Sequence, residues 1–134
     1  MLPFRDSGDH AFSRYENGKT KPPLALAKML EDRQAHARFR MVVFSGHVHN
    51  YERHEHGGIT YFVSGGGAAH AYPIERAPDD PFQSKEINYH YLLVEVDHLQ
   101  LKVTMNRLQL KNNVATWTQP DSVKISVERA SNGE

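Results

Sequence analysis

Two histidines stand two residues apart at the end of a short apolar run, and this spacing suits metal binding. His47 and His49 follow Gly46, which lets the backbone bend sharply so that both imidazoles can be presented to one cleft. Neutral imidazole is a good ligand for Zn, Fe, Mn or Ni, and two neutral rings cost less to dehydrate than two charges. The apolar run, residues 41–45, has the composition of a buried strand. Because ligands gather beyond the carboxyl ends of strands in open α/β sheets, we expect a metal site here.

The residues around this pair extend the motif in both composition and order. Residues 46–53 read Gly-His-Val-His-Asn-Tyr-Glu-Arg, and residues 58–68 read Gly-Ile-Thr-Tyr-Phe-Val-Ser-Gly-Gly-Gly-Ala. The first string resembles the last metal motif of the calcineurin-like metallophosphoesterases, in particular their purple-acid-phosphatase-like members. The second string is similar to the strand and Gly-rich turn that follow that motif in the family. The resemblance covers residues 24–70, and less clearly the strands up to residue 108.

The resemblance implies a metal-dependent phosphoesterase with an α/β fold, in which this chain is the C-terminal portion of a four-layer α/β/β/α sandwich. It also implies two metal ions, divalent or trivalent (Fe, Mn or Zn), bridged by a carboxylate and a hydroxide. By position, His47 matches a ligand of the second metal and His49 a ligand of the first. Paired metals would hold the attacking and phosphoryl oxygens of a phosphomonoester or phosphodiester substrate.

The other ligand motifs of that family are missing from this chain. Its Asp-x-His, Gly-Asp-x-x-Asp and Gly-Asn-His-Glu motifs all precede the His-x-His segment, and none of them occurs here. We therefore expect residues 1–134 to be a single partial domain that lacks the N-terminal half of the catalytic domain. A chain without those oxygen ligands is expected to be inactive alone.

Further polar residues near the His pair are candidates for substrate contact or for plain structural roles. Asn50 and Arg53 follow the pair, and His70 follows the Gly-rich turn, so all three are candidate substrate-binding residues. Tyr51 is a candidate beside Asn50, but it could equally pack beside the sheet. Arg53 could instead form an ion pair with Glu52 that fixes the loop, or be a plain surface charge. The alternative for His70 is an ordinary loop position. His54 and His56 precede two glycines, which favours a solvated hairpin turn over an extension of the metal site.

The hydrophobic pattern predicts one helix, several strands and a long excursion. We expect a helix over residues 23–37 and strands over 41–45, 59–64 and 123–127. Residues 89–96 and 99–108 are expected to pair as a hairpin. We also expect an irregular segment over 68–86, with a turn at Asp79 and Asp80, and a disordered tail over 129–134. A sheet that has lost its packing partner would expose an apolar face and a free edge. We therefore expect a homo-oligomer formed through residues 89–108.

The composition of the chain gives no support for nucleic-acid or membrane binding. Lys plus Arg equals Asp plus Glu, at 16 each, so no net field favours nucleic acid or an anionic membrane. The chain has no Cys and no apolar stretch of membrane-spanning length, and its localisation is not indicated. Two alternatives to the phosphoesterase remain. A His-x-His pair followed by a Glu also resembles the pattern of cupin-like proteins with a single metal, although Glu52 follows the pair too early for that pattern. The nine His also suit a non-catalytic His-rich metal-binding or interaction domain.

Overall fold

The structure, a computed structural model, describes residues 22–67 and 70–128. The elements in chain order are α1 (Pro22–His36), β1 (Val42–Ser45), β2 (Tyr51–His56), β3 (Ile59–Ser64), β4 (Tyr89–Val96), β5 (Gln100–Lys111) and β6 (Val114–Ser126). The strands form two three-stranded sheets. The expected mixed α/β class is confirmed, with most of the regular structure in the sheets.

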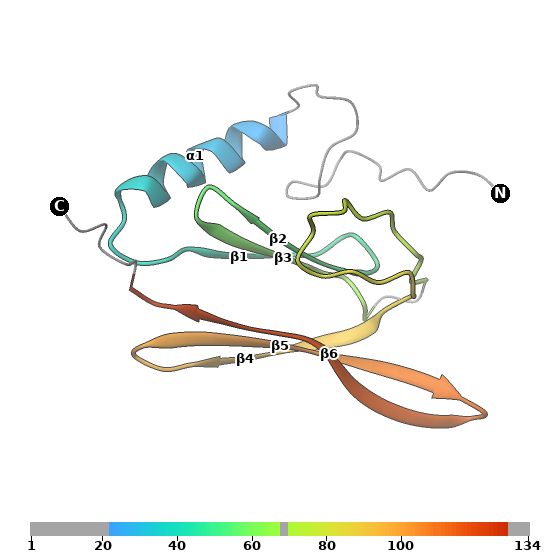
Figure 1. Cartoon of the computed structure of the whole chain (residues 1–134). Helices are drawn as coiled ribbons and strands as arrows, with labels where there is room; N and C mark the ends of the chain where they lie inside the picture. The colour runs from blue at the N-terminus through green and yellow to red at the C-terminus, as the bar shows by residue number, and fades with distance from the viewer. Residues whose placement is uncertain (1–21, 68–69, 129–134) are drawn as a thin grey trace.

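The first sheet has the order β1-β3-β2, with β1 parallel and β2 antiparallel to the central strand β3. Nearly every residue of β3 is buried, which explains why its sequence is a continuous apolar run rather than an alternating one. Helix α1 lies over one face of this sheet (Figure 1). The buried Gln34 side chain ties the helix to the start of β1, since its Nε2 donates to the Phe39 carbonyl and its Oε1 accepts from the Met41 amide.

The second sheet is an antiparallel meander, β4-β5-β6, on the opposite face of the first sheet from α1 (Figure 1). The core between the two sheets consists of Tyr51, Phe62, Phe82, Val103, Met105 and Ile125. The described residues thus form three layers, one helix and two sheets. The four-layer sandwich that the resemblance implies is not shown by them.

Several expected boundaries agree with the structure, but β5, predicted over 99–108, continues to Lys111, and the start of the last strand also differs. The helix predicted over 23–37 lies at Pro22–His36, and the strands at 59–64 and 89–96 are as predicted. The last strand, predicted over 123–127, is present as β6, but it begins earlier than predicted, at Val114. Strand β6 follows a tight turn in which Asn112 and Asn113 both have positive φ, 51° and 60°. This geometry suits a hairpin with a two-residue loop. Strand β2, with its charged sequence, was not predicted.

The irregular segment is confirmed where the structure describes it, since residues 70–88 contain neither helix nor strand. Residues 1–21 and the predicted disordered tail, 129–134, lie outside the described residues. Among the residues that are described, the single helix is too short and too polar to cross a membrane.

Candidate metal site

The predicted His pair lies in the turn that follows β1, at the carboxyl end of the parallel strand pair. His47 has a φ of 80°, a left-handed conformation that is uncommon for a residue with a side chain. Holding such a conformation costs of order 1–3 kcal/mol, and residues of this kind cluster at functional sites. The His47 side chain is exposed. The turn therefore holds the first imidazole outward at some cost in backbone energy.

The imidazole of His49 is oriented by the segment that follows the Gly-rich turn. Its Nδ1 lies 2.8 Å from the carbonyl oxygen of His70, and its ring lies 5.6 Å from that of Tyr72. A carbonyl oxygen can only accept, so Nδ1 carries the proton and Nε2 presents its lone pair. The backbone is held as well, because the Tyr72 amide donates to the His49 carbonyl at 3.3 Å. His49 thus has the tautomer that a metal ligand bound through Nε2 requires.

Asn50 connects the His turn to the irregular segment from inside the protein. It is fully buried, and its Nδ2 donates to the Tyr72 carbonyl at 2.6 Å. Its Oδ1 accepts from the Tyr51 amide, from Asn88 Nδ2 and from Arg76 Nη2. In this conformation Asn50 cannot touch a ligand, and its amide fixes the turn instead.

Two glycines let the end of β3 approach the His turn closely. A Cβ at Gly65 would lie 2.0 Å from the Val48 carbonyl oxygen, and one at Gly66 would lie 1.9 Å from His90 Nδ1. The Gly65 amide also donates to the Asn50 carbonyl at 3.1 Å. The Gly-rich turn is thus packed between the His pair and β4, which explains the need for residues without side chains.

His90 and Ser64 form a buried polar pair beside this turn that sequence reasoning missed. His90 Nδ1 donates to the Asn88 carbonyl at 2.8 Å, so its Nε2 accepts from the Ser64 hydroxyl at 2.9 Å. Burial lowers the pKa of the His90 imidazole below its usual range, and the hydrogen bond to Asn88 offsets this only in part. Ser64 and His90 are 26 residues apart, so only the fold reveals the contact.

Stability should therefore depend on pH through His90. Because its folded pKa lies below the ordinary value of about 6.5, the unfolded chain binds the proton more readily. The contribution of His90 to the free energy of unfolding is complete at pH values above its ordinary pKa. This contribution is lost as the pH falls through the lower pKa that His90 has in the folded protein. Urea unfolding of the chain and of His90→Gln measures this. We expect the advantage of the unmodified chain to be larger at neutral than at acidic pH, and an advantage that grows on acidification would contradict it.

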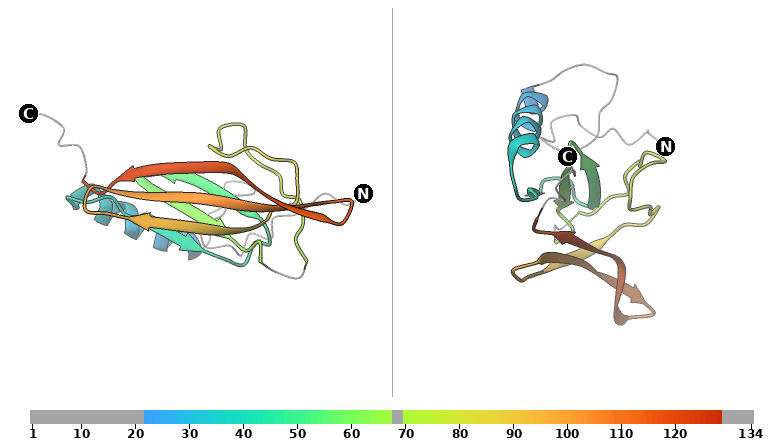
Figure 2. Two further views of the ribbon diagram at one scale, coloured as in Figure 1. Left: turned by 90° about the horizontal axis from the view of Figure 1, so that it is seen from below. Right: turned by 60° about the vertical axis from the view of Figure 1, so that its left-hand side comes forward.

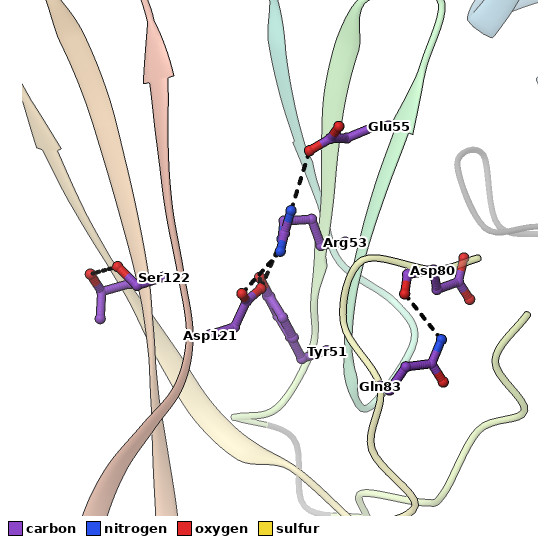
Figure 3. A network of polar contacts seen from close by, with 8 residues as sticks. Tyr51, Arg53, Glu55, Asp80, Gln83, Asp121 and Ser122 are labelled. Atoms are coloured by element: carbon purple, nitrogen blue, oxygen red, sulfur yellow. Dashed lines mark hydrogen bonds and ion pairs between the residues drawn. The ribbon is translucent and has the colours of Figure 1, made fainter. Parts of the chain in front are cut away.

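Arg53 points toward Asp121 of the second sheet (Figure 3). Its Nε and Nη2 donate to the two carboxylate oxygens of Asp121 at 2.8 and 3.1 Å, and the Tyr51 hydroxyl donates to the same carboxylate at 2.7 Å. Burial, with the Asp121 charge, raises the pKa of the Tyr51 phenol, so this hydroxyl remains a donor. The candidate phosphate-binding group is thus occupied in a bridge between the sheets.

A second buried polar cluster lies on β2 and corrects the expectation for His54. Instead of a solvated turn residue, His54 is buried, with Nε2 3.0 Å from Glu52 Oε2 and Nδ1 3.3 Å from Asp80 Oδ1. Asp80 closes a turn as expected, since its amide donates to the Ala77 carbonyl at 3.0 Å, but its side chain is also buried, 8% exposed. The expectation fits His56, which is exposed at the hairpin tip. The alternation of Glu52 and His54 along the chain is the signal that would have indicated a strand face.

The site residues predicted from the sequence are brought together only in part. His47, His49 and the backbone of His70 meet at one edge of the first sheet, whereas Asn50 and Arg53 are turned inward. Within the described ranges, no three His, Asp or Glu side chains are grouped so as to hold a metal ion. The described part of the chain therefore supplies two imidazoles and no complete ligand set.

Comparison with protein-family models, with curated proteins and with solved structures finds no match for this chain.

Proposed function

We propose that this chain contributes His47 and His49 as imidazole ligands to the metal centre of a metal-dependent phosphoesterase. The observation that carries the proposal is the fixed tautomer of His49, whose Nδ1 donates to the His70 carbonyl so that Nε2 is available. Metal-ligating histidines almost always donate their other ring N–H to an acceptor of this kind. The strained backbone of His47 and the family-like string at residues 46–53 support the same assignment.

The imidazoles of His47 and His49 supply only part of the ligands that a two-metal centre requires. Two neutral imidazoles suit Zn or Fe, but a two-metal centre also needs anionic oxygen ligands. In the proposal these oxygens come from outside the described residues, in keeping with the three earlier motifs of the resembling family. Metal ions bound there would supply an activated hydroxide and neutralise charge on the phosphoester.

The neighbouring residues of this chain then have positioning roles. Asn50 and Gly65 hold the turn that carries both imidazoles, and the buried His90 packs against Gly66 behind it. Of the three residues first considered for substrate contact, only His70 has an exposed side chain beside the turn. His70 is therefore the residue proposed to meet the substrate.

The two alternative functions predict different metal stoichiometry. A cupin-like protein would hold one ion tightly, and a His-rich sequestering domain would hold several ions weakly. The cupin reading is disfavoured by the parallel pairing of β1 with β3 and by helix α1, which do not belong to an all-β barrel. Metal content measured after dialysis separates these readings.

The experiment that tests the function is turnover of p-nitrophenyl phosphate and bis-p-nitrophenyl phosphate with added Mn, Zn or Fe. The proteins compared are this chain and a longer protein that joins the segment to the three earlier motifs, with and without His47→Ala. We expect turnover only by the longer protein, and a loss of at least about 100-fold in His47→Ala. Even the loss of a group that only orients a metal ligand costs about 10- to 100-fold. An unaffected His47→Ala protein would overturn the ligand assignment. Robust turnover by this chain alone would overturn the need for outside ligands.

A further inference from the structure

One long edge of the second sheet has no partner strand among the described residues and points its backbone groups outward. Strand β4 forms this edge, with β6 on the opposite side of β5 (Figure 2). The His90 amide donates to the Gly66 carbonyl, away from β5, whereas the Asp97 amide donates toward it, to the Gln100 carbonyl. Successive residues of an antiparallel strand alternate in this respect. The backbone groups of Leu92, Val94 and Val96 therefore face outward, and nothing in the described ranges pairs with them.

This edge lacks the features that normally prevent strand pairing. Natural edge strands are protected by Pro, Lys, bulges or covering segments. Strand β4 reads Tyr-His-Tyr-Leu-Leu-Val-Glu-Val, with Glu95 as its only charged residue, and it pairs with β5 without a bulge. Strand β6 contains Pro120 and Lys124, so the opposite edge carries such protection. Exposed apolar side chains accompany the β4 edge, among them Leu93 and Val96.

We propose that a second copy of this chain pairs with β4 in antiparallel register, centred on Val94, to form a continuous six-stranded sheet. In this register Leu92 lies opposite Val96 of the second copy, and the outward groups of all three residues form about six backbone hydrogen bonds. Paired residues also share a face of the sheet, because the register joins even-numbered with even-numbered positions.

This register keeps the acidic side chains of the two β4 strands away from each other. The Glu95 side chain lies opposite Leu93 of the second copy, so the two acidic residues never face each other. The Leu93 side chain is 47% exposed, so its apolar surface is available for the contact. A two-fold axis through Val94 therefore satisfies the edge without burying like charges, which is why the occupant is a second copy. The register uses residues 92–96 and does not depend on the proposed metal site.

Static light scattering at tens of micromolar tests the dimer on the unmodified chain and on Val94→Pro. Because the Val94 amide points away from β5, Pro at this position removes interface hydrogen bonds but no bond within the sheet. We expect twice the chain mass for the unmodified protein and a monomer for Val94→Pro. A monomeric unmodified chain would overturn the proposal, whichever other segment covers the edge.

A charge pair tests the register with variants that change only an exposed side chain. Leu93→Glu places a second carboxylate opposite Glu95 of the partner copy, whereas Leu93→Lys places an ammonium there. Each contact occurs twice in the dimer, so we expect the dissociation constant of Leu93→Glu to exceed that of Leu93→Lys by at least about tenfold. Equal constants would overturn the register. Trp117→Lys changes the same outer face on β6, and a dimer abolished by this variant would show face packing instead of edge pairing.

Discussion

Replacing Asp121 by Ala is expected to lower the free energy of unfolding by about 3–5 kcal/mol, the range for breaking one partner of a buried ion pair. The carboxylate joins β6 to β2 by accepting from Arg53 and from the Tyr51 hydroxyl. The side chains of Arg53 and Asp121 are only 10% and 9% exposed. Removing the carboxylate leaves a guanidinium and a phenol without their acceptor inside the protein. Urea unfolding monitored by circular dichroism measures the loss.

Glu55 provides the matched control. Its carboxylate also contacts Arg53, at 3.3 Å, but its side chain is 58% exposed. Because exposed ion pairs contribute about 0–1 kcal/mol, Glu55→Ala should change stability by no more than that. Similar losses for Glu55→Ala and Asp121→Ala would show that burial of the bridge does not determine its contribution.

Replacing Gly65 by Ala is expected to destabilise the fold by about 3 kcal/mol and to displace the His turn. The new Cβ would lie 2.0 Å from the Val48 carbonyl oxygen and 2.8 Å from its carbon. Both atoms are backbone, so no side chain can rotate to relieve the contact. Since Val48 lies between the two candidate ligands, the turn itself must move. Thermal unfolding and the NMR chemical shifts of the His49 ring measure the two effects.

Gly67 is the control for this substitution, in the same run of glycines. A Cβ at Gly67 meets nothing within 4 Å in the described structure. Gly67→Ala should therefore stay within about 0.5 kcal/mol of the unmodified chain and leave the His49 shifts unchanged. If both variants behaved alike, close packing of the turn on Val48 would not be the reason for the glycine.

The elements that the sequence predicts well are those whose signal is local. Strand β3 is a continuous apolar run with a Gly-rich end, and the turn after β1 is marked by Gly46 between apolar and His residues. Strand β2 was missed because its burial depends on partners far along the chain. Arg53 meets Asp121 68 residues away, and His54 meets Asp80 26 residues away. Period-2 apolar patterning cannot find a strand whose inward residues are charged and paired.

In the candidate site, too, the features with a local signal in the sequence were predicted, and those that depend on distant residues were not. The imidazoles of His47 and His49 were predicted from their spacing, and the fold places both in the turn at the end of β1. The inward rotation of Asn50 and Arg53 was not predictable, because it depends on Tyr72, Asn88 and Asp121 arriving from distant segments. The turn from β5 into β6 was not predicted, although its two consecutive Asn residues, which favour positive φ, were a signal for it.

His47 and His49 are proposed to bind metal, and isothermal titration of this chain with Zn²⁺ measures that binding. Zn is the ion chosen because two imidazoles alone suit it better than they suit Mg or Mn. His98, exposed in the hairpin between β4 and β5, provides the control. We expect one weakly bound ion whose affinity falls at least about tenfold in His47→Ala and in His49→Ala, but not in His98→Ala. Unchanged Zn²⁺ affinity in the His47→Ala and His49→Ala variants would contradict the assignment of these two histidines as metal ligands.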